Sequence, residues 1–110
     1  MEYQAISKLV HVSPRKARLV ADAVKKFSPA QAMEKLEFMA QAVSLTINKT
    51  LKSAVANATQ SGKVKTQDLK IKNIIIDEGV RMKRQDTSHR PGHQGLIHKR
   101  TSHIKVILEG

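Results

Sequence analysis

Basic side chains are concentrated in one segment of the chain, residues 80–105. This segment carries seven lysines and arginines against a single acid, Asp86, together with four of the five histidines. Such side chains bind phosphates through charge and hydrogen bonds, and neutralising phosphates releases condensed counterions. The whole chain has the same bias, with 20 Lys and Arg against 9 Asp and Glu and a net charge of +11. The composition therefore predicts a polyanionic partner.

Other kinds of chemistry find little support in the same segment. Its histidines could suggest a zinc site, but they have no cysteine, no compact ligand spacing and only Asp86 as a nearby carboxylate. Ser102 and His103 could suggest a hydrolase triad with Asp86, yet adjacent residues of a strand point to opposite faces. We therefore predict no catalytic residue, no metal and no cofactor.

Length and composition limit the class of protein. A chain of 110 residues is long enough for one domain, which we expect to span residues 1–110. The absence of cysteine excludes disulfides and thiolate chemistry, and is consistent with a reducing compartment. The N-terminus does not have the pattern of a signal peptide, and no apolar run approaches the roughly 18 residues that cross a bilayer. The sequence thus predicts a cytoplasmic protein.

Helix signals follow the first strand. Ser13-Pro14 and Ser28-Pro29 each combine an N-cap with proline at the first helical position, so they predict two helix starts, the first helix ending near Phe27. Its apolar stripe contains Ala17, Val20, Ala23 and Val24. A third stripe runs to Ser61-Gly62, where glycine suits a left-handed cap. Nothing marks the boundary between the second and third helices.

Strand signals lie at both ends of this helical region. Residues 3–10 have a mixed strand pattern, and residues 69–77 and 104–108 are rich in β-branched and apolar side chains. The order of one strand, three helices and further strands predicts an α+β fold. We expect three helices packed on a small antiparallel sheet, with a long protruding β-hairpin.

The hairpin is the favoured interpretation of residues 80–105, with disorder as the alternative. Residues 83–95 contain no hydrophobic side chain, and a structureless loop of this length is unusual inside a compact domain. Turn-forming residues at Pro91-Gly92 and Gly95 favour two strands around a turn.

One strand register sorts the side chains of the hairpin into an apolar and a polar face near its base. With residues 91–95 as a five-residue turn, Val80 lies opposite Val106 and Met82 opposite Ile104. Apolar side chains near the base of the hairpin then share one face, and a shift of one residue would separate them.

Several partners compete for such an arm. It has no aromatic side chain on which bases could stack, so RNA recognition would depend on backbone and shape. A DNA-architectural protein is the main alternative, with Pro91 as a wedge in the minor groove. An RNA chaperone with a disordered tail is a third possibility, opposed by the apolar end of the chain. A membrane surface would require bulky apolar anchors on a basic helix, which the first helix lacks.

Several motifs resemble one known family in order and spacing. KRTSHI, followed by hydrophobic alternation, resembles the C-terminal signature of universal large-subunit ribosomal protein family number twenty-two. Four other motifs resemble further parts of that family, so that the resemblance covers essentially the whole chain. They are SPRKARLVAD (residues 13–22), LKSAVANA (51–58), DEG (77–79) and MKR (82–84).

The resemblance implies a non-enzymatic constituent of the large ribosomal subunit whose hairpin threads through ribosomal RNA and lines the nascent-peptide exit tunnel. The implied partners are large-subunit RNA, neighbouring ribosomal proteins and, in passing, the nascent peptide, without a homo-oligomer. Together with the basic residues of body and arm, it gives a set of expected RNA contacts: Arg15, Lys16, Arg18, Lys25, Arg81, Lys83, Arg84, Arg90, Lys99, Arg100, His103 and Lys105. The tunnel tip is expected at Arg90, Pro91, Gly92 and His93. His93 stands where the family usually has arginine, which lowers the charge of the tip at neutral pH.

Overall fold

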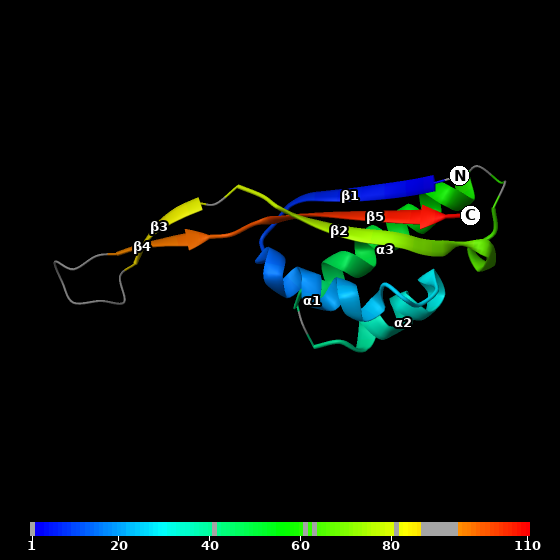
Figure 1. Ribbon diagram of the computed structural model, residues 1–110, viewed down its shortest axis with the longest axis horizontal. Coiled ribbons are helices and arrows are strands. Elements are labelled where there is room, and N and C mark those ends of the chain that lie inside the picture. The colour runs from blue at the N-terminus through cyan, green and yellow to red at the C-terminus, as the bar shows by residue number, and fades with distance from the viewer. Residues whose placement is uncertain (1, 41, 61, 63, 81, 87–94) are drawn as a thin grey trace.

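Three helices lie against one face of a three-stranded antiparallel sheet, and a two-stranded arm extends from one end (Figure 1). The computed structural model describes residues 2–40, 42–60, 62, 64–80, 82–86 and 95–110, and gives the backbone path for 82–86 and 95–99. In chain order the elements are β1 (Glu2–Val10), α1 (Pro14–Val24), α2 (Pro29–Phe38), α3 (Ala42–Gln60), the 3-10 helix η1 (Thr66–Asp68), β2 (Lys70–Glu78), β3 (Met82–Asp86), β4 (Gly95–Lys99) and β5 (Ser102–Glu109). The predicted α+β class is confirmed.

The two serine-proline signals start helices as predicted. The Ser13 hydroxyl accepts a hydrogen bond from the Lys16 N–H, and the Ser28 hydroxyl accepts one from the Gln31 N–H, each at 3.4 Å. Each bond satisfies one of the N–H groups that the first turn of a helix leaves without a partner. The first helix ends at Val24, slightly before the predicted end.

The ends of the other helices have different causes. Gly62, just beyond α3, has φ +73°, the left-handed conformation predicted for it. The unmarked boundary between α2 and α3 falls at Met39, whose extended backbone (φ −78°, ψ 138°) ends α2. Ala23 of the predicted core stripe is exposed, and Ala21 is buried in its place.

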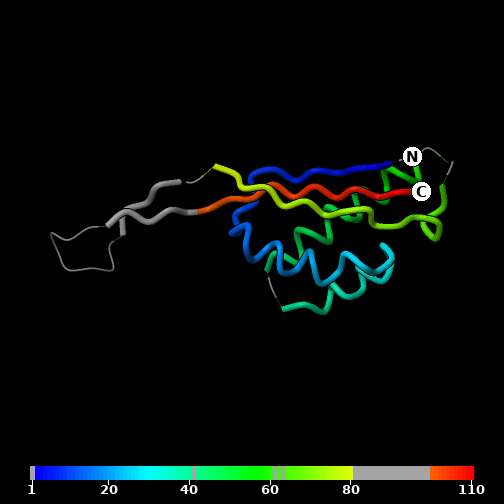
Figure 2. Tube along the Cα trace, in the orientation of Figure 1, coloured from blue at the N-terminus to red at the C-terminus, as the bar shows by residue number. Residues whose placement is uncertain are grey.

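The last strand occupies the centre of the sheet, in the order β1-β5-β2 (Figure 2). Ile104, Val106 and Leu108 of β5 are fully buried and face the helices, whereas the residues between them are half-buried on the opposite face. The helices contribute Leu36, from α2, and the α3 residues Ile47, Leu51 and Ala54 to the same core. The body is thus held by aliphatic side chains, and one face of its sheet is left without helices.

The register predicted for the arm is wrong. Ile104 is the partner of Ile76 in β2, within the body, and not of Met82. Met82 is instead the partner of Lys99, in a separate two-stranded sheet formed by β3 and β4. The predicted pairing of Val80 with Val106 fails for the same reason, since the apolar part of β5 is used entirely to complete the body.

The two sheets are also offset by one residue. Residues 79–81 connect β2 to β3, whereas only residues 100 and 101 connect β4 to β5. The pairing register of the body, with Glu78 opposite Ser102, therefore does not continue into the arm, where Met82 is opposite Lys99. Gly95, assigned to the turn by prediction, is the first residue of β4 and the partner of Asp86. The rest of the predicted turn, residues 91–94, lies outside the described residues.

Candidate nucleic-acid interface

The arm leaves the body through a tight clasp formed by Gly79, Val80 and Thr101. The Gly79 N–H donates to the Thr101 carbonyl at 2.9 Å, and the Thr101 hydroxyl donates to the Val80 carbonyl at 2.7 Å. A Cβ atom on Gly79 would lie 2.4 Å from the Thr101 hydroxyl oxygen, closer than real contacts allow. Thr101 is only 2% exposed, so its side chain has little room to move. The clasp therefore fixes the direction in which the arm departs.

Two further bonds tie the start of β5 to the end of β1. The Ser102 hydroxyl donates to the Val12 carbonyl at 2.6 Å, and the Leu9 N–H donates to His103 Nδ1 at 3.1 Å. Leu9 has φ +54°, in the left-handed region, at an irregularity in the β1–β5 pairing. Ser102 is fully buried. This part of KRTSHI therefore has a structural role in addition to any contact with RNA.

Sequence reasoning missed Thr101 and Ser102 as positioning residues. The sequence signal that could have identified them is a pair of hydroxyl side chains placed where the polar segment ends and the alternating apolar residues of β5 begin. Buried hydroxyls must find hydrogen-bond partners, and here the partners are backbone carbonyls of segments distant in sequence.

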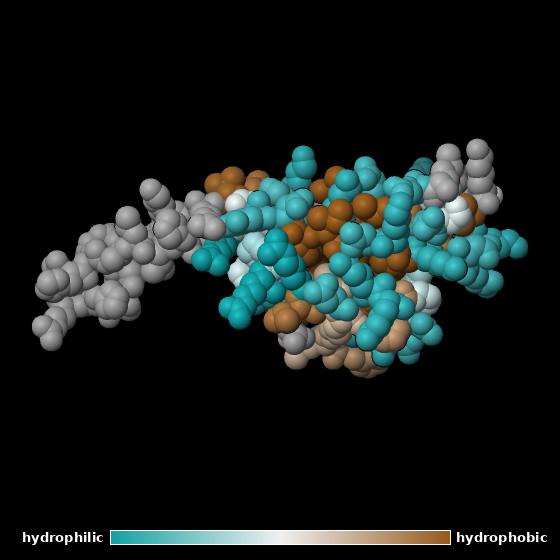
Figure 3. Space-filling model, in the orientation of Figure 1, coloured by the Kyte–Doolittle hydropathy of each residue, from teal (hydrophilic) through white to brown (hydrophobic). Residues whose placement is uncertain are grey.

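Exposed cations surround the clasp. The β1 strand runs toward the arm and leads into α1, so that α1 begins at the end of the body from which the arm leaves (Figure 1). Arg15 and Lys16 of its first turn are exposed, as is Arg100 at the foot of the arm. In the part of the chain whose side chains are described, none of these three forms an ion pair. We call Arg15, Lys16 and Arg100 the junction surface; hydrophilic side chains are prominent at this end of the body (Figure 3).

Other predicted contacts have partners within the protein. Arg18 donates from its guanidinium to the Ile76 carbonyl at 3.0 Å, on the edge strand β2. Lys25 lies 3.5 Å from the Asp22 carboxylate, one turn earlier on α1. His103 accepts from Leu9, as described above. Lys105 is half-buried on the sheet face that the helices leave uncovered. These residues are less available to a polyanion than the junction surface.

The remaining predicted contacts lie on the arm. Lys83 and Arg84 belong to β3, and Lys99 belongs to β4, so the pairing of these strands brings their backbones together. Arg81, Arg90 and the tip residues Pro91, Gly92 and His93 lie outside the described residues. Their roles stay predictions.

The opposite end of the body has balanced charge. Lys72 donates a hydrogen bond to the Glu2 carboxylate across the sheet. This bond, together with the positive charge of Lys72, lowers the pKa of Glu2, and the carboxylate in turn raises the pKa of Lys72. No ion pair of this kind involves the three cations of the junction surface among the described side chains.

The described ranges contain neither a metal site nor a membrane-spanning helix. Within them, no three His, Asp or Glu side chains come together as metal ligands would. Nor is any described helix both long and apolar enough to cross a bilayer.

Comparison with known proteins gives a consistent result over the whole chain. The model of the family Ribosomal protein L22p/L17e matches residues 5–109. The large ribosomal subunit protein uL22 of Methylacidiphilum infernorum is 39% identical over 109 residues, covering 99% of this chain and 95% of the relative. The proteins of the same name from Desulfotalea psychrophila and Desulfatibacillum aliphaticivorans are 41% and 44% identical, each over 99% of this chain and 98% and 99% of their own lengths.

Proposed function

The chain belongs to the ribosomal protein L22p/L17e family, and from this premise we propose that it binds large-subunit ribosomal RNA through its junction surface and its basic arm. It is a protein of the large ribosomal subunit, where its role is structural and not enzymatic, and its place in the cell is the cytoplasm. The proposal adds which surfaces meet RNA and how the protein holds them.

The observation that carries the proposal is the unpaired charge beside the clasp. The first turn of α1, which contains Arg15 and Lys16, begins at the end of the body from which the arm leaves (Figure 1), and Arg100 is at the foot of that arm; none of the three has an acidic partner among the described side chains. Like charges held together repel one another, and phosphates relieve this repulsion while releasing counterions. The clasp aligns this surface with the base of the arm, so both can meet one folded RNA.

The arm extends the same chemistry away from the body. The longest dimension of the molecule is 62 Å, against 24 and 16 Å across it. The radius of gyration is 16.9 Å, more than the ~13 Å of a compact chain of about 100 residues. Such a shape suits an element that lies between RNA segments. By resemblance to its family, we propose that the tip, Arg90 to His93, lines the exit tunnel and meets the nascent peptide.

Cosedimentation tests membership of the subunit. The tagged chain should migrate with large subunits after a high-salt wash. Tagging either terminus is suitable, because both lie at the end of the body opposite the arm (Figure 1). Free protein at the top of the gradient would contradict the proposal.

Salt dependence tests the RNA surface. Arg15→Ala and Arg100→Ala should each weaken binding to ribosomal RNA and flatten the slope of log K against log salt by about 0.7–0.9, the effect of losing one phosphate contact. Lys52→Ala is the matched control, because Lys52 is exposed on α3 and already lies 3.9 Å from Glu37. An unchanged slope in both arginine variants would exclude phosphate contact at the junction. Equal or tighter binding to duplex DNA would favour the DNA-architectural alternative.

A further inference from the structure

A groove lies between α1 and the turn that joins α2 to α3. Its lining has one charged residue, Lys16, and is otherwise apolar: Val12, Leu19, Val20, Ala23, Met39, Ala42 and Val43. Val20 and Val43 belong to the core, whereas Leu19 is 69% exposed. Leu19 is outside the stripe of α1 that faces the sheet, so the fold of this chain alone does not explain it.

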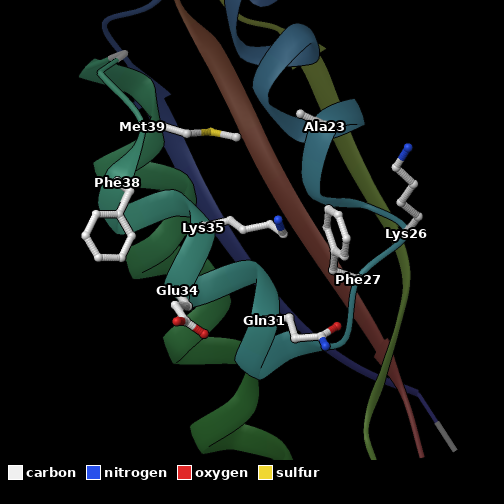
Figure 4. Close-up of a pocket in the computed structure, with 8 residues that line it drawn as sticks. All are labelled: Ala23, Lys26, Phe27, Gln31, Glu34, Lys35, Phe38 and Met39. Carbon is white, nitrogen blue, oxygen red and sulfur yellow. The ribbon is translucent and has the colours of Figure 1, made fainter.

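The groove continues past Ala23 and Met39 along α2, and there its lining becomes charged (Figure 4). Met39 extends from the end of α2 toward α1, and Lys35 extends toward Phe27. The Lys35 ammonium lies 4.4 Å from the centre of the Phe27 ring, a distance typical of a cation–π contact. Lys26 stands on the α1 side of this end. We call the whole surface the helix groove.

The helix groove exposes apolar surface, which binding of a charged partner alone would not require. Phe38, at its edge, is 83% exposed, and its ring lies on the side of α2 away from α1 (Figure 4). An exposed apolar patch with a polar rim marks an interaction surface more often than an isolated exposed side chain does. The groove has the composition of a protein-binding site, an apolar centre with a charged rim.

Two occupants are poorly matched to it. RNA phosphates would meet the lysines, but they would leave Leu19 and Met39 without apolar contact, and the junction surface offers them better chemistry. A second copy of this chain would bring another net charge of +11 to a rim that is already basic. The charged residues of the helix groove are one acid, Glu34, and three lysines, Lys16, Lys26 and Lys35.

We propose that the helix groove docks a segment of another protein, with apolar anchor side chains flanked by carboxylates. The anchors cover Leu19, Ala23 and Met39, and the carboxylates pair with Lys26 and Lys35. This inference rests on the proposed function in one respect: because the chain is a protein of the large subunit, the partner is a neighbouring protein of that subunit. The protein then has two interfaces that adjoin at Lys16, which lines the helix groove and belongs to the junction surface: the junction surface for RNA and the helix groove for protein.

Carbodiimide coupling tests the charge match on the unmodified chain. The reagent joins a lysine to a carboxylate in contact with it, so salt-washed large subunits should yield Lys26 or Lys35 joined to an Asp or Glu of one other protein. That Asp or Glu should lie within a segment that also contains apolar side chains. The Lys52–Glu37 pair within the chain serves as an internal control for the reaction. Coupling at the control pair without coupling at Lys26 or Lys35 would overturn the proposal.

A photoreactive side chain tests the apolar match. With p-benzoylphenylalanine in place of Phe38, irradiated subunits should give a product with the same protein segment. The same group in place of Ile6, which is 48% exposed on the uncovered face of the sheet, should not. Replacing both rim lysines, K26E with K35E, should lower the yield at least about tenfold by placing like charges together.

The outcomes separate this inference from the proposed function. A product between position 38 and ribosomal RNA, or with a second copy of the chain, would overturn the helix groove while leaving the RNA proposal intact. Absence of the unmodified chain from large subunits would overturn both. If the variant at position 38 fails to enter subunits, the carbodiimide result on the unmodified chain decides.

Discussion

Replacing Gly79 with alanine should loosen the base of the arm, although the backbone of Gly79 has no positive φ that would by itself exclude alanine. The new methyl carbon would lie 2.4 Å from the Thr101 hydroxyl oxygen and 3.3 Å from the Thr101 backbone. The hydroxyl must move, and moving it breaks its bond to the Val80 carbonyl. The substitution thus combines overpacking with the loss of a buried hydrogen bond.

The magnitude follows from these two effects. Overpacking a buried site costs about 1–3 kcal/mol, and a lost hydrogen bond costs about 1 kcal/mol. In the opposite direction, alanine stabilises the protein by about 0.4–1 kcal/mol relative to glycine, because it reduces the conformational entropy of the unfolded chain. The free energy of unfolding of Gly79→Ala should therefore fall by about 1–3 kcal/mol, measured by urea denaturation.

A double-mutant cycle isolates the cause. Thr101→Ala removes the hydroxyl that blocks the methyl group, so Gly79→Ala should cost almost nothing in that background. The coupling energy between the two sites should then equal most of the cost of Gly79→Ala. Equal costs of Gly79→Ala in both backgrounds would refute the steric explanation of the clasp.

Three further changes test other parts of the structure. Leu9→Val should lower the free energy of unfolding by about 1–2 kcal/mol, because a β-branched side chain is strained at positive φ. Ile6→Val in the same strand is the control. Equal effects of the two substitutions would argue against a left-handed backbone conformation at Leu9. Ser102→Ala should lower the free energy of unfolding by about 1–2 kcal/mol, because the part-buried hydrogen bond to the Val12 carbonyl loses its donor, and denaturation midpoints unchanged from those of the unsubstituted chain would contradict it. The pKa of Glu2 is lower in the folded state than in the unfolded state. Its pair with Lys72 therefore stabilises the fold at pH values above the unfolded-state pKa, and this stabilisation is lost as the pH falls through the folded-state pKa. Lys72→Ala should raise the Glu2 pKa toward its ordinary value in an NMR titration, and an unchanged pKa would contradict the pair.

Local signals in the sequence predicted most of the body. Ser13 and Ser28 start helices because a capping hydroxyl and a following proline act on the nearest turn and need no tertiary partner. The strand over 69–77 was recognisable because β-branched side chains favour extended backbone, and β2 occupies residues 70–78. The predicted class followed from the order of these elements.

The register of the arm could not be predicted in the same way. The prediction paired Val106 with Val80 and Ile104 with Met82, because all four are apolar and lie at equal distances from the predicted turn. The structure pairs Val106 and Ile104 with β1 and β2 instead, since the centre of a sheet buries more apolar surface than a hairpin in solvent. Alternation along one strand does not reveal how many neighbours that strand has.

The candidate site was predicted by type of residue more than by role. Charge count identified Arg15 and Arg100, which the structure leaves exposed, but it assigned Arg18 and Lys25 to the same group. Which carbonyl or carboxylate lies beside a cation depends on tertiary packing, as the contact from Arg18 to Ile76 shows. Thr101 and Ser102 were missed for the same reason.

The central place of β5 has a consequence for biosynthesis. Strands β1 and β2 do not pair with each other; both pair with β5, which follows all the other described elements in the chain. The sheet therefore cannot close until β5 has been made, and closing it must bring together β1 and β5, which are far apart in sequence, a slow kind of contact. Strands β3 and β4 are close in sequence and can pair before the sheet closes. The newly made protein would then present its basic arm while its own body is still incomplete.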